Sequence, residues 1–186
     1  MKKILLSSLA VALCLSFTAC DTNETDSKEV AKDQNEQKFD DTKIEDDSKF
    51  VVNAADGGML EVKLGELAQT NAASADVKAF GKMMVDDHSK ANKELMDLAA
   101  AKAITVPATM GEDNMKMYND LMAKKGTDFD KAYMSMMVDD HEDDVDMFRK
   151  ESESGADAEI KMFASRTLPT LQQHHERAKT VRDMVK

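Results

Sequence analysis

The feature that most constrains the fold is a stripe of apolar residues, spaced three and four apart, that recurs in four long segments. The stripes run through positions 50–68, 77–98, 134–148 and 160–185. This spacing places residues on one face of an α-helix, whereas a half-buried strand would alternate strictly. Only two prolines and seven glycines occur in the 186 residues, and both residue types disfavour helix interiors. The sequence therefore predicts an all-α domain.

The longest connection decides the topology. Four long amphipathic helices predict a four-helix bundle, and residues 103–126 join the second to the third, with a short helical piece between Gly111 and Gly126. A tight hairpin needs only a few residues, so this connection is long enough to return along the bundle. We predict a ferritin-like bundle, up-down-down-up, with a short extra helix in the crossover. The second and third long helices then run parallel.

Residues 1–19 are typical of a lipoprotein signal peptide. A short basic start precedes an apolar run, Ile4 to Phe17, that is too short to span a bilayer comfortably. The run leads through Phe17-Thr18-Ala19 to Cys20, which resembles a bacterial lipobox, so we expect Cys20 to carry the lipid anchor. Secretion with cleavage elsewhere is the alternative. Since Cys14 lies in the removed segment, we expect no thiol that serves catalysis, a disulfide or a metal.

An acidic segment separates this anchor from the domain. Residues 21–50 hold eleven Asp and Glu against five Lys, with few apolar side chains. Such a composition does not offset chain entropy by burial, so we predict a disordered tether at 20–47 and one globular domain at 48–186. The net charge of −11 argues against a nucleic-acid partner, because no basic stripe is present to neutralise phosphates.

A repeated hexapeptide points to a polar site. MMVDDH occurs at 83–88 and again at 136–141, and Glu61, His88, His141 and His174 each fall on the apolar stripe of a different helix. Buried polar groups of this kind need partners or a bound ion. A count through the connecting loops places His174 about four to six residues above the others, although Pro169 is able to kink its helix.

Two further residue types accompany the histidines. Met84 and Met137 precede His88 and His141 by four residues, so thioether and imidazole share a face. We expect Asp87 and Asp140 to receive an imidazole N–H and to orient the ring. Imidazoles with thioethers suit copper, and imidazoles with Glu61 suit zinc. A di-iron centre is disfavoured, because no Glu-x-x-His pair is present.

The alternative interpretation needs no ligand. Methionine on a helical stripe is commonly core filler, and a core histidine is commonly hydrogen-bonded. On this interpretation the Glu and His residues form a buried network that only sets the packing of the helices, in an envelope structural or interaction module.

These residues also carry a family resemblance. The runs GGMLEVKLGELAQTNAASADVKAFGKMMVDDHSKANKEL, FDKAYMSMMVDDHEDDVDMF and FASRTLPTLQQHHERA resemble the bacterial envelope family catalogued as domain of unknown function 4142. The resemblance covers about 49–185 and implies a ferritin-like fold; members are often labelled predicted outer membrane proteins. The recurrent Glu and His positions of the family fall on Glu61, His88, His141 and His174. The family has no agreed activity.

Taken together, the sequence predicts a lipid-anchored protein of the bacterial cell envelope that binds a metal, copper or zinc, in a sequestration or stress role. We expect a binding protein and not an enzyme. The expected partner is a membrane, reached through the N-terminal lipid. The family label favours the outer membrane, whereas Asp21 directly after the lipid cysteine favours the inner membrane facing the periplasm.

Overall fold

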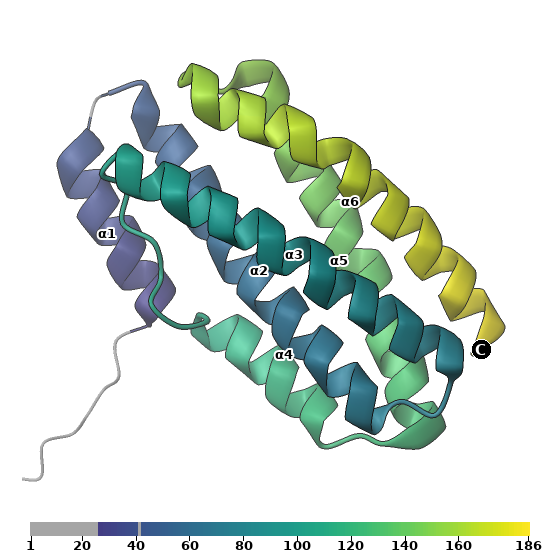
Figure 1. Cartoon of the computed structure of the whole chain (residues 1–186). Coiled ribbons are helices and arrows are strands. Elements are labelled where there is room, and N and C mark those ends of the chain that lie inside the picture. The colour runs from purple at the N-terminus through teal and green to yellow at the C-terminus, as the bar shows by residue number, and fades with distance from the viewer. Residues whose placement is uncertain (1–25, 41) are drawn as a thin grey trace, which may run out of the picture.

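The computed structural model describes residues 26–40 and 42–186, and apart from one isolated β-bridge all regular structure in these residues is helical (Figure 1). The all-α prediction is confirmed for this part of the chain. The helices are α1 (Ser27–Phe39), α2 (Ile44–Asn71), α3 (Ala75–Ala101), α4 (Glu112–Met122), α5 (Gly126–Ser154) and α6 (Ala158–Met184). Among the described helices, none is both long and apolar enough to cross a bilayer. The signal peptide and the lipid attachment at Cys20 lie outside the described residues.

The four long helices form two hairpins. Residues 72–74 join α2 to α3, and residues 155–157 join α5 to α6. Within the first hairpin, Gly65 and Gly81 let the two helices approach closely, because a Cβ on Gly65 would lie 2.5 Å from the Gly81 carbonyl oxygen. The Ser74 side chain accepts a hydrogen bond from the Val77 N–H and caps the start of α3.

Two buried carboxylates join the hairpins and fix the helix directions. Asp130, near the start of α5, accepts hydrogen bonds from the N–H groups of Ala73 and Ser74 at 3.1 and 2.9 Å. At the opposite end Asp47, near the start of α2, accepts one from the Ala156 N–H at 2.9 Å. Helices α3 and α5 therefore begin at the same end of the molecule, and α2 runs opposite to α5 (Figure 1).

The long connection between α3 and α5 carries the short helix α4 along one side of the bundle. Helix α4 lies between Gly111 and Gly126, where the sequence predicted a helical piece, and packs against α2 and α5. Asp56 of α2 accepts a hydrogen bond from the Gly111 N–H at 2.7 Å and pairs with Lys28 of α1 at 3.0 Å. The connection is thus tied to both α1 and α2.

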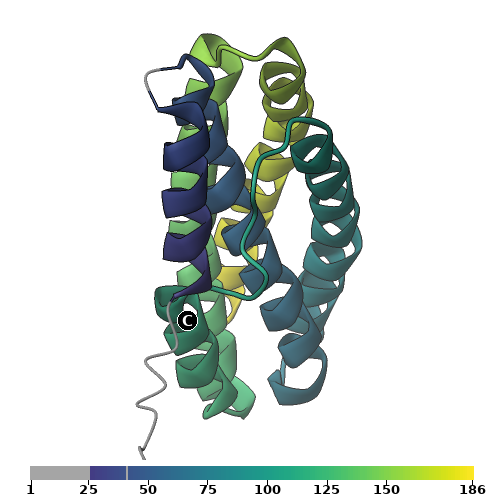
Figure 2. The same ribbon diagram turned by 90° about the vertical axis from the view of Figure 1, so that its left-hand side faces the viewer.

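The prediction of a disordered tether at 20–47 is wrong for α1 and for the start of α2, which are helical and packed (Figure 2). The reason is polar pairing, which apolar periodicity does not reveal. The buried Asn35 side chain donates to the Thr105 carbonyl and accepts from the Thr105 N–H, both at 2.7 Å. The Ser27 hydroxyl accepts from the Ala108 N–H at 2.9 Å. Helix α1 is therefore held against the long connection by hydrogen bonds.

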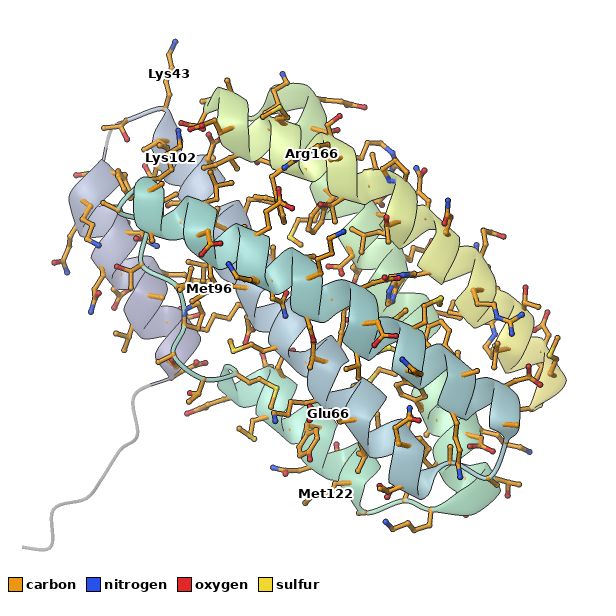
Figure 3. The ribbon with its side chains drawn as sticks, in the orientation of Figure 1. Lys43, Glu66, Met96, Lys102, Met122 and Arg166 are labelled. Atoms are coloured by element: carbon orange, nitrogen blue, oxygen red, sulfur yellow. The ribbon has the colours of Figure 1, made fainter. Side chains whose placement is uncertain are left out.

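Two apolar clusters fill the bundle, one towards each end. The first cluster includes Leu60, Leu64, Phe80, Met84, Tyr133, Met134, Met137 and Val181. The second cluster includes Phe50, Val51, Leu95, Val145, Phe148, Ile160, Phe163 and Leu171. Long side chains on the outer faces, such as Lys43, Met96 and Met122, point away from the bundle (Figure 3). Positions 88, 141 and 174 fall between the two clusters on α3, α5 and α6, and Glu61 of α2 follows Leu60 at the edge of the first cluster, so a polar layer divides the core.

Candidate metal centre

Each long helix contributes one polar side chain to this layer. Glu61, His88, His141 and His174 are 1, 5, 0 and 2 % exposed. The centroids of the three imidazole rings lie 5.2 to 5.6 Å apart, and one nitrogen from each ring lies within 4.8 Å of the others. Helix α6 continues through Pro169 and brings His174 to the level of His88, so the expected height difference is wrong. The structure brings together all four residues that the sequence placed on the stripes.

A chain of hydrogen bonds links Glu61 to the surface between α3 and α6. Glu61 Oε2 lies 2.6 Å from His88 Nδ1, and His88 Nε2 lies 3.2 Å from His174 Nδ1. His174 Nε2 lies 2.9 Å from Asp87 Oδ2, and the Asp87 side chain is 48 % exposed. Asp87 therefore faces the imidazole of the opposite helix and not that of its sequence neighbour. Both ring nitrogens of His88 and of His174 are engaged.

His141 has one engaged nitrogen and one free nitrogen. Its Nδ1 donates to the Met137 carbonyl oxygen at 3.0 Å, one turn earlier on α5. A carbonyl oxygen only accepts, so the proton of the neutral ring is on Nδ1 and the lone pair is on Nε2. That Nε2 lies 3.3 Å from Glu61 Oε1, and both atoms are buried without a hydrogen-bond partner. The centre therefore contains two facing atoms with unused lone pairs.

Asp140 does not orient His141 as the sequence predicted, because the Met137 carbonyl already takes the Nδ1 proton. Its buried Oδ2 has no hydrogen-bond partner. One oxygen each of Asp140 and Glu61 and one nitrogen of His141 lie within 4.8 Å of one another. Asp140 thus belongs among the groups able to hold a cation, and its position next to His141 in the sequence was the only signal for this.

Three further residues belong to the first apolar cluster: Met84 and Met137, which the sequence suggested as ligands, and Tyr133. Met84 and Met137 are fully buried there, so both serve as core residues. Tyr133 is also fully buried, and its hydroxyl has no hydrogen-bond partner. Its ring stacks on Phe129 at 5.4 Å, which explains the burial but not the hydroxyl. Sequence reasoning missed Tyr133, which lies two turns before His141 on α5.

Burial keeps the imidazoles neutral. It lowers the pKa of His88 to about 4, against smaller opposing effects of the Asp140 and Asp87 charges. Burial, with repulsion from His88 and His174, also holds the pKa of His141 well below its ordinary value. The pKa of His174 is lowered by burial despite its hydrogen bond to Asp87. Neutral imidazole is the form that ligates metals.

Burial also disfavours ionisation of the carboxyl groups. It raises the pKa of Glu61 well above its ordinary value. The pKa of Asp140 is raised well above its ordinary value by burial and by the charge of Glu61. Two carboxylates that are difficult to ionise together become favourable ligands once a cation supplies positive charge between them.

Comparison with known proteins identifies a family without an assigned activity. A family model described as "Domain of unknown function (DUF4142)" matches residues 29–181. No curated protein and no solved structure matches the chain. The functional conclusions therefore depend on the geometry of the polar layer.

Proposed function

This chain belongs to the DUF4142 family, and we propose that it is a ferritin-like, up-down-down-up bundle that binds a transition metal in the polar layer of Glu61, His88, His141 and His174. The observation that carries this proposal is the pair of buried atoms Glu61 Oε1 and His141 Nε2, which face each other at 3.3 Å without a hydrogen-bond partner. A buried polar atom without a partner costs about 1–3 kcal/mol. A bound cation satisfies both atoms at once.

The donor atoms favour zinc among the two metals expected from the sequence. Imidazole nitrogens and carboxylate oxygens are ordinary zinc ligands, while imidazole also suits copper. Glu61 and the three imidazoles come from four different helices, so a bound ion would cross-link the two hairpins and stabilise the bundle.

The biological role we propose follows from the N-terminal sequence. A lipid on Cys20 would hold the bundle at a membrane of the bacterial envelope, the outer membrane by preference, where it sequesters metal or protects against metal stress. This role is supported by the lipobox-like run at 17–20 and by the burial of Glu61 and His141, which are 1 and 0 % exposed. We propose binding and not catalysis.

A second candidate function is supported by the hydrogen-bond chain from Glu61 to Asp87. Its three contacts of 2.6, 3.2 and 2.9 Å need no ion. Such a chain fixes the register of α2, α3 and α6 by itself, as expected of a structural or interaction module.

Metal binding and a purely structural network are distinguished by metal analysis of the purified protein and by its titration with Zn²⁺ and Cu²⁺. The same measurements are made on the variants His88→Ala and His141→Ala. Metal binding predicts one tightly bound ion per chain and a weaker affinity in both variants. A structural network predicts that both variants melt at lower temperature to the same extent with and without metal. Absence of stoichiometric metal from the intact protein, under oxidising and reducing conditions, would contradict the metal function.

A further inference from the structure

The polar layer offers two different sets of three donor atoms. One set consists of nitrogens of His88, His141 and His174, and the other consists of oxygens of Glu61 and Asp140 with a nitrogen of His141. His141 has only one free nitrogen, Nε2, because Nδ1 bonds to the Met137 carbonyl. One nitrogen lone pair ligates one ion, so the two sets compete for the same atom.

The state of the donor atoms decides between the sets. Every ring nitrogen of His88 and His174 takes part in the chain from Glu61 to Asp87. An ion held by the three imidazoles would break the 3.2 Å contact between His88 and His174. In contrast, Glu61 Oε1, Asp140 Oδ2 and His141 Nε2 are all buried and without hydrogen-bond partners. An ion in the second set leaves the contact between His88 and His174 in place and satisfies three buried atoms.

The distance between two of the free atoms fits coordination. Zinc bonds to nitrogen and oxygen of about 2.0–2.2 Å, arranged tetrahedrally, separate neighbouring ligand atoms by roughly 3.3–3.6 Å. Glu61 Oε1 and His141 Nε2 lie 3.3 Å apart. The separation of these two unpartnered atoms therefore fits two ligands of one ion.

We propose, on the basis of the metal function above, that Glu61, Asp140 and His141 ligate the ion, while His88, His174 and Asp87 only support Glu61. The 2.6 Å contact from His88 Nδ1 to Glu61 Oε2 holds one carboxylate oxygen, so that the other faces His141. The half-exposed Asp87 in turn fixes His174. Partners of this kind fix the orientation of a ligand without touching the metal.

This assignment also names the class of ion. One imidazole and two carboxylates form a hard to intermediate donor set, which suits a divalent ion such as Zn²⁺, Fe²⁺ or Mn²⁺. Cu⁺ prefers thioether and thiolate sulfur, and this donor set contains no sulfur. The donor set thus disfavours Cu⁺ and favours a divalent ion.

The first test measures Zn²⁺ affinity by calorimetric titration in a variant of Asp140, in a variant of His174 and in a control variant of the neighbouring Asp139. Asp140→Asn removes a ligand and should weaken binding by more than about 100-fold, whereas loss of a supporting partner, in His174→Gln, should weaken it by about 10-fold. Asp139→Asn makes the same change in charge at the exposed adjacent position and should leave the affinity unchanged. A greater loss in His174→Gln than in Asp140→Asn would overturn the assignment and leave the metal function standing.

The second test needs no variant and so does not depend on variant folding. In the zinc-loaded wild-type protein, ¹⁵N NMR of the histidine rings should show one metal-bound nitrogen, on His141. Two or three metal-bound imidazoles would overturn the assignment in favour of the three-histidine set. A wild-type protein that binds no stoichiometric Zn²⁺, Fe²⁺ or Mn²⁺ would overturn both the assignment and the metal function.

Discussion

Replacing Gly81 with alanine should force α3 away from α2. A Cβ at position 81 would lie 2.6 Å from the Ala68 Cβ and 2.9 Å from the Gly65 carbonyl oxygen. Both obstacles are fixed to helix backbone, so the helices themselves must separate. The contact lies about two turns from His88 and one turn from Glu61. The separation should therefore also lengthen the 2.6 Å contact between Glu61 and His88.

Two opposing terms set the size of the effect. Alanine in a helix interior is more favourable than glycine by about 1 kcal/mol. Overpacking costs about 1–3 kcal/mol, and two contacts under 3 Å, one of them to a backbone atom, place Gly81 at the upper end. The net loss is roughly 2 kcal/mol. For a domain of this size, this lowers Tm by about 4–8 °C.

Gly57 provides the matched control on the same hairpin. It is helical, and a Cβ there would have no atom within 4 Å. Gly57→Ala should therefore stabilise the protein by about 0.5–1 kcal/mol. Urea denaturation should show that the unfolding free energies of the two variants differ by about 3 kcal/mol, with m values equal to that of wild type. Equal stability of the two variants would refute the close approach of α2 and α3.

Three other predictions concern buried polar groups. Tyr133→Phe should raise the unfolding free energy of the metal-free protein by about 1 kcal/mol in urea, because it removes a buried hydroxyl without a partner; a loss of that size would reveal a hidden partner. Burial and the Asp47 charge raise the pKa of Glu151 to about 7, so stability from its neutral form is present at pH 4.5 and lost as the pH rises to about 7. Glu151→Gln should remove this loss, so the unfolding free energy of the variant relative to wild type should be roughly 1–2 kcal/mol higher at pH 8 than at pH 5. Thermal melting of both proteins at both pH values measures this difference. A difference between the proteins that does not change with pH would contradict the prediction. The raised pKa values of Glu61 and Asp140 require protons to leave when metal binds, so Zn²⁺ affinity should rise by about tenfold per pH unit for each proton released. Titration in buffers of different ionisation enthalpy counts those protons, and a pH-independent affinity would show that both carboxyls are already ionised.

Apolar periodicity predicted the four long helices because each must bury one face. It also placed Glu61, His88, His141 and His174 on the inward faces of their helices, since a polar residue on a core stripe points inward whatever the detailed packing. The position of His174 along the bundle was predicted poorly. A count through loops ignores helix tilt and side-chain reach, which together bring His174 to 3.2 Å from His88.

The features that sequence reasoning missed depend on hydrogen bonds between distant residues. Helix α1 has little apolar surface and is fixed by Asn35 to Thr105, seventy positions away. The partner of His141 is the backbone carbonyl of Met137, which carries no side-chain signature. This bond leaves Asp140 free, so the change of Asp140 from an orienting residue to a proposed ligand required the structure.

The central claim is that the polar layer holds one divalent metal ion, and the most direct test is the zinc stoichiometry of the purified wild-type protein. Calorimetric titration of the metal-free protein with Zn²⁺ should give one site per chain, and a Glu61→Gln variant should lose that site while remaining helical. A wild-type protein that shows no saturable site, or a Glu61→Gln variant that binds Zn²⁺ as tightly as wild type, would contradict the account.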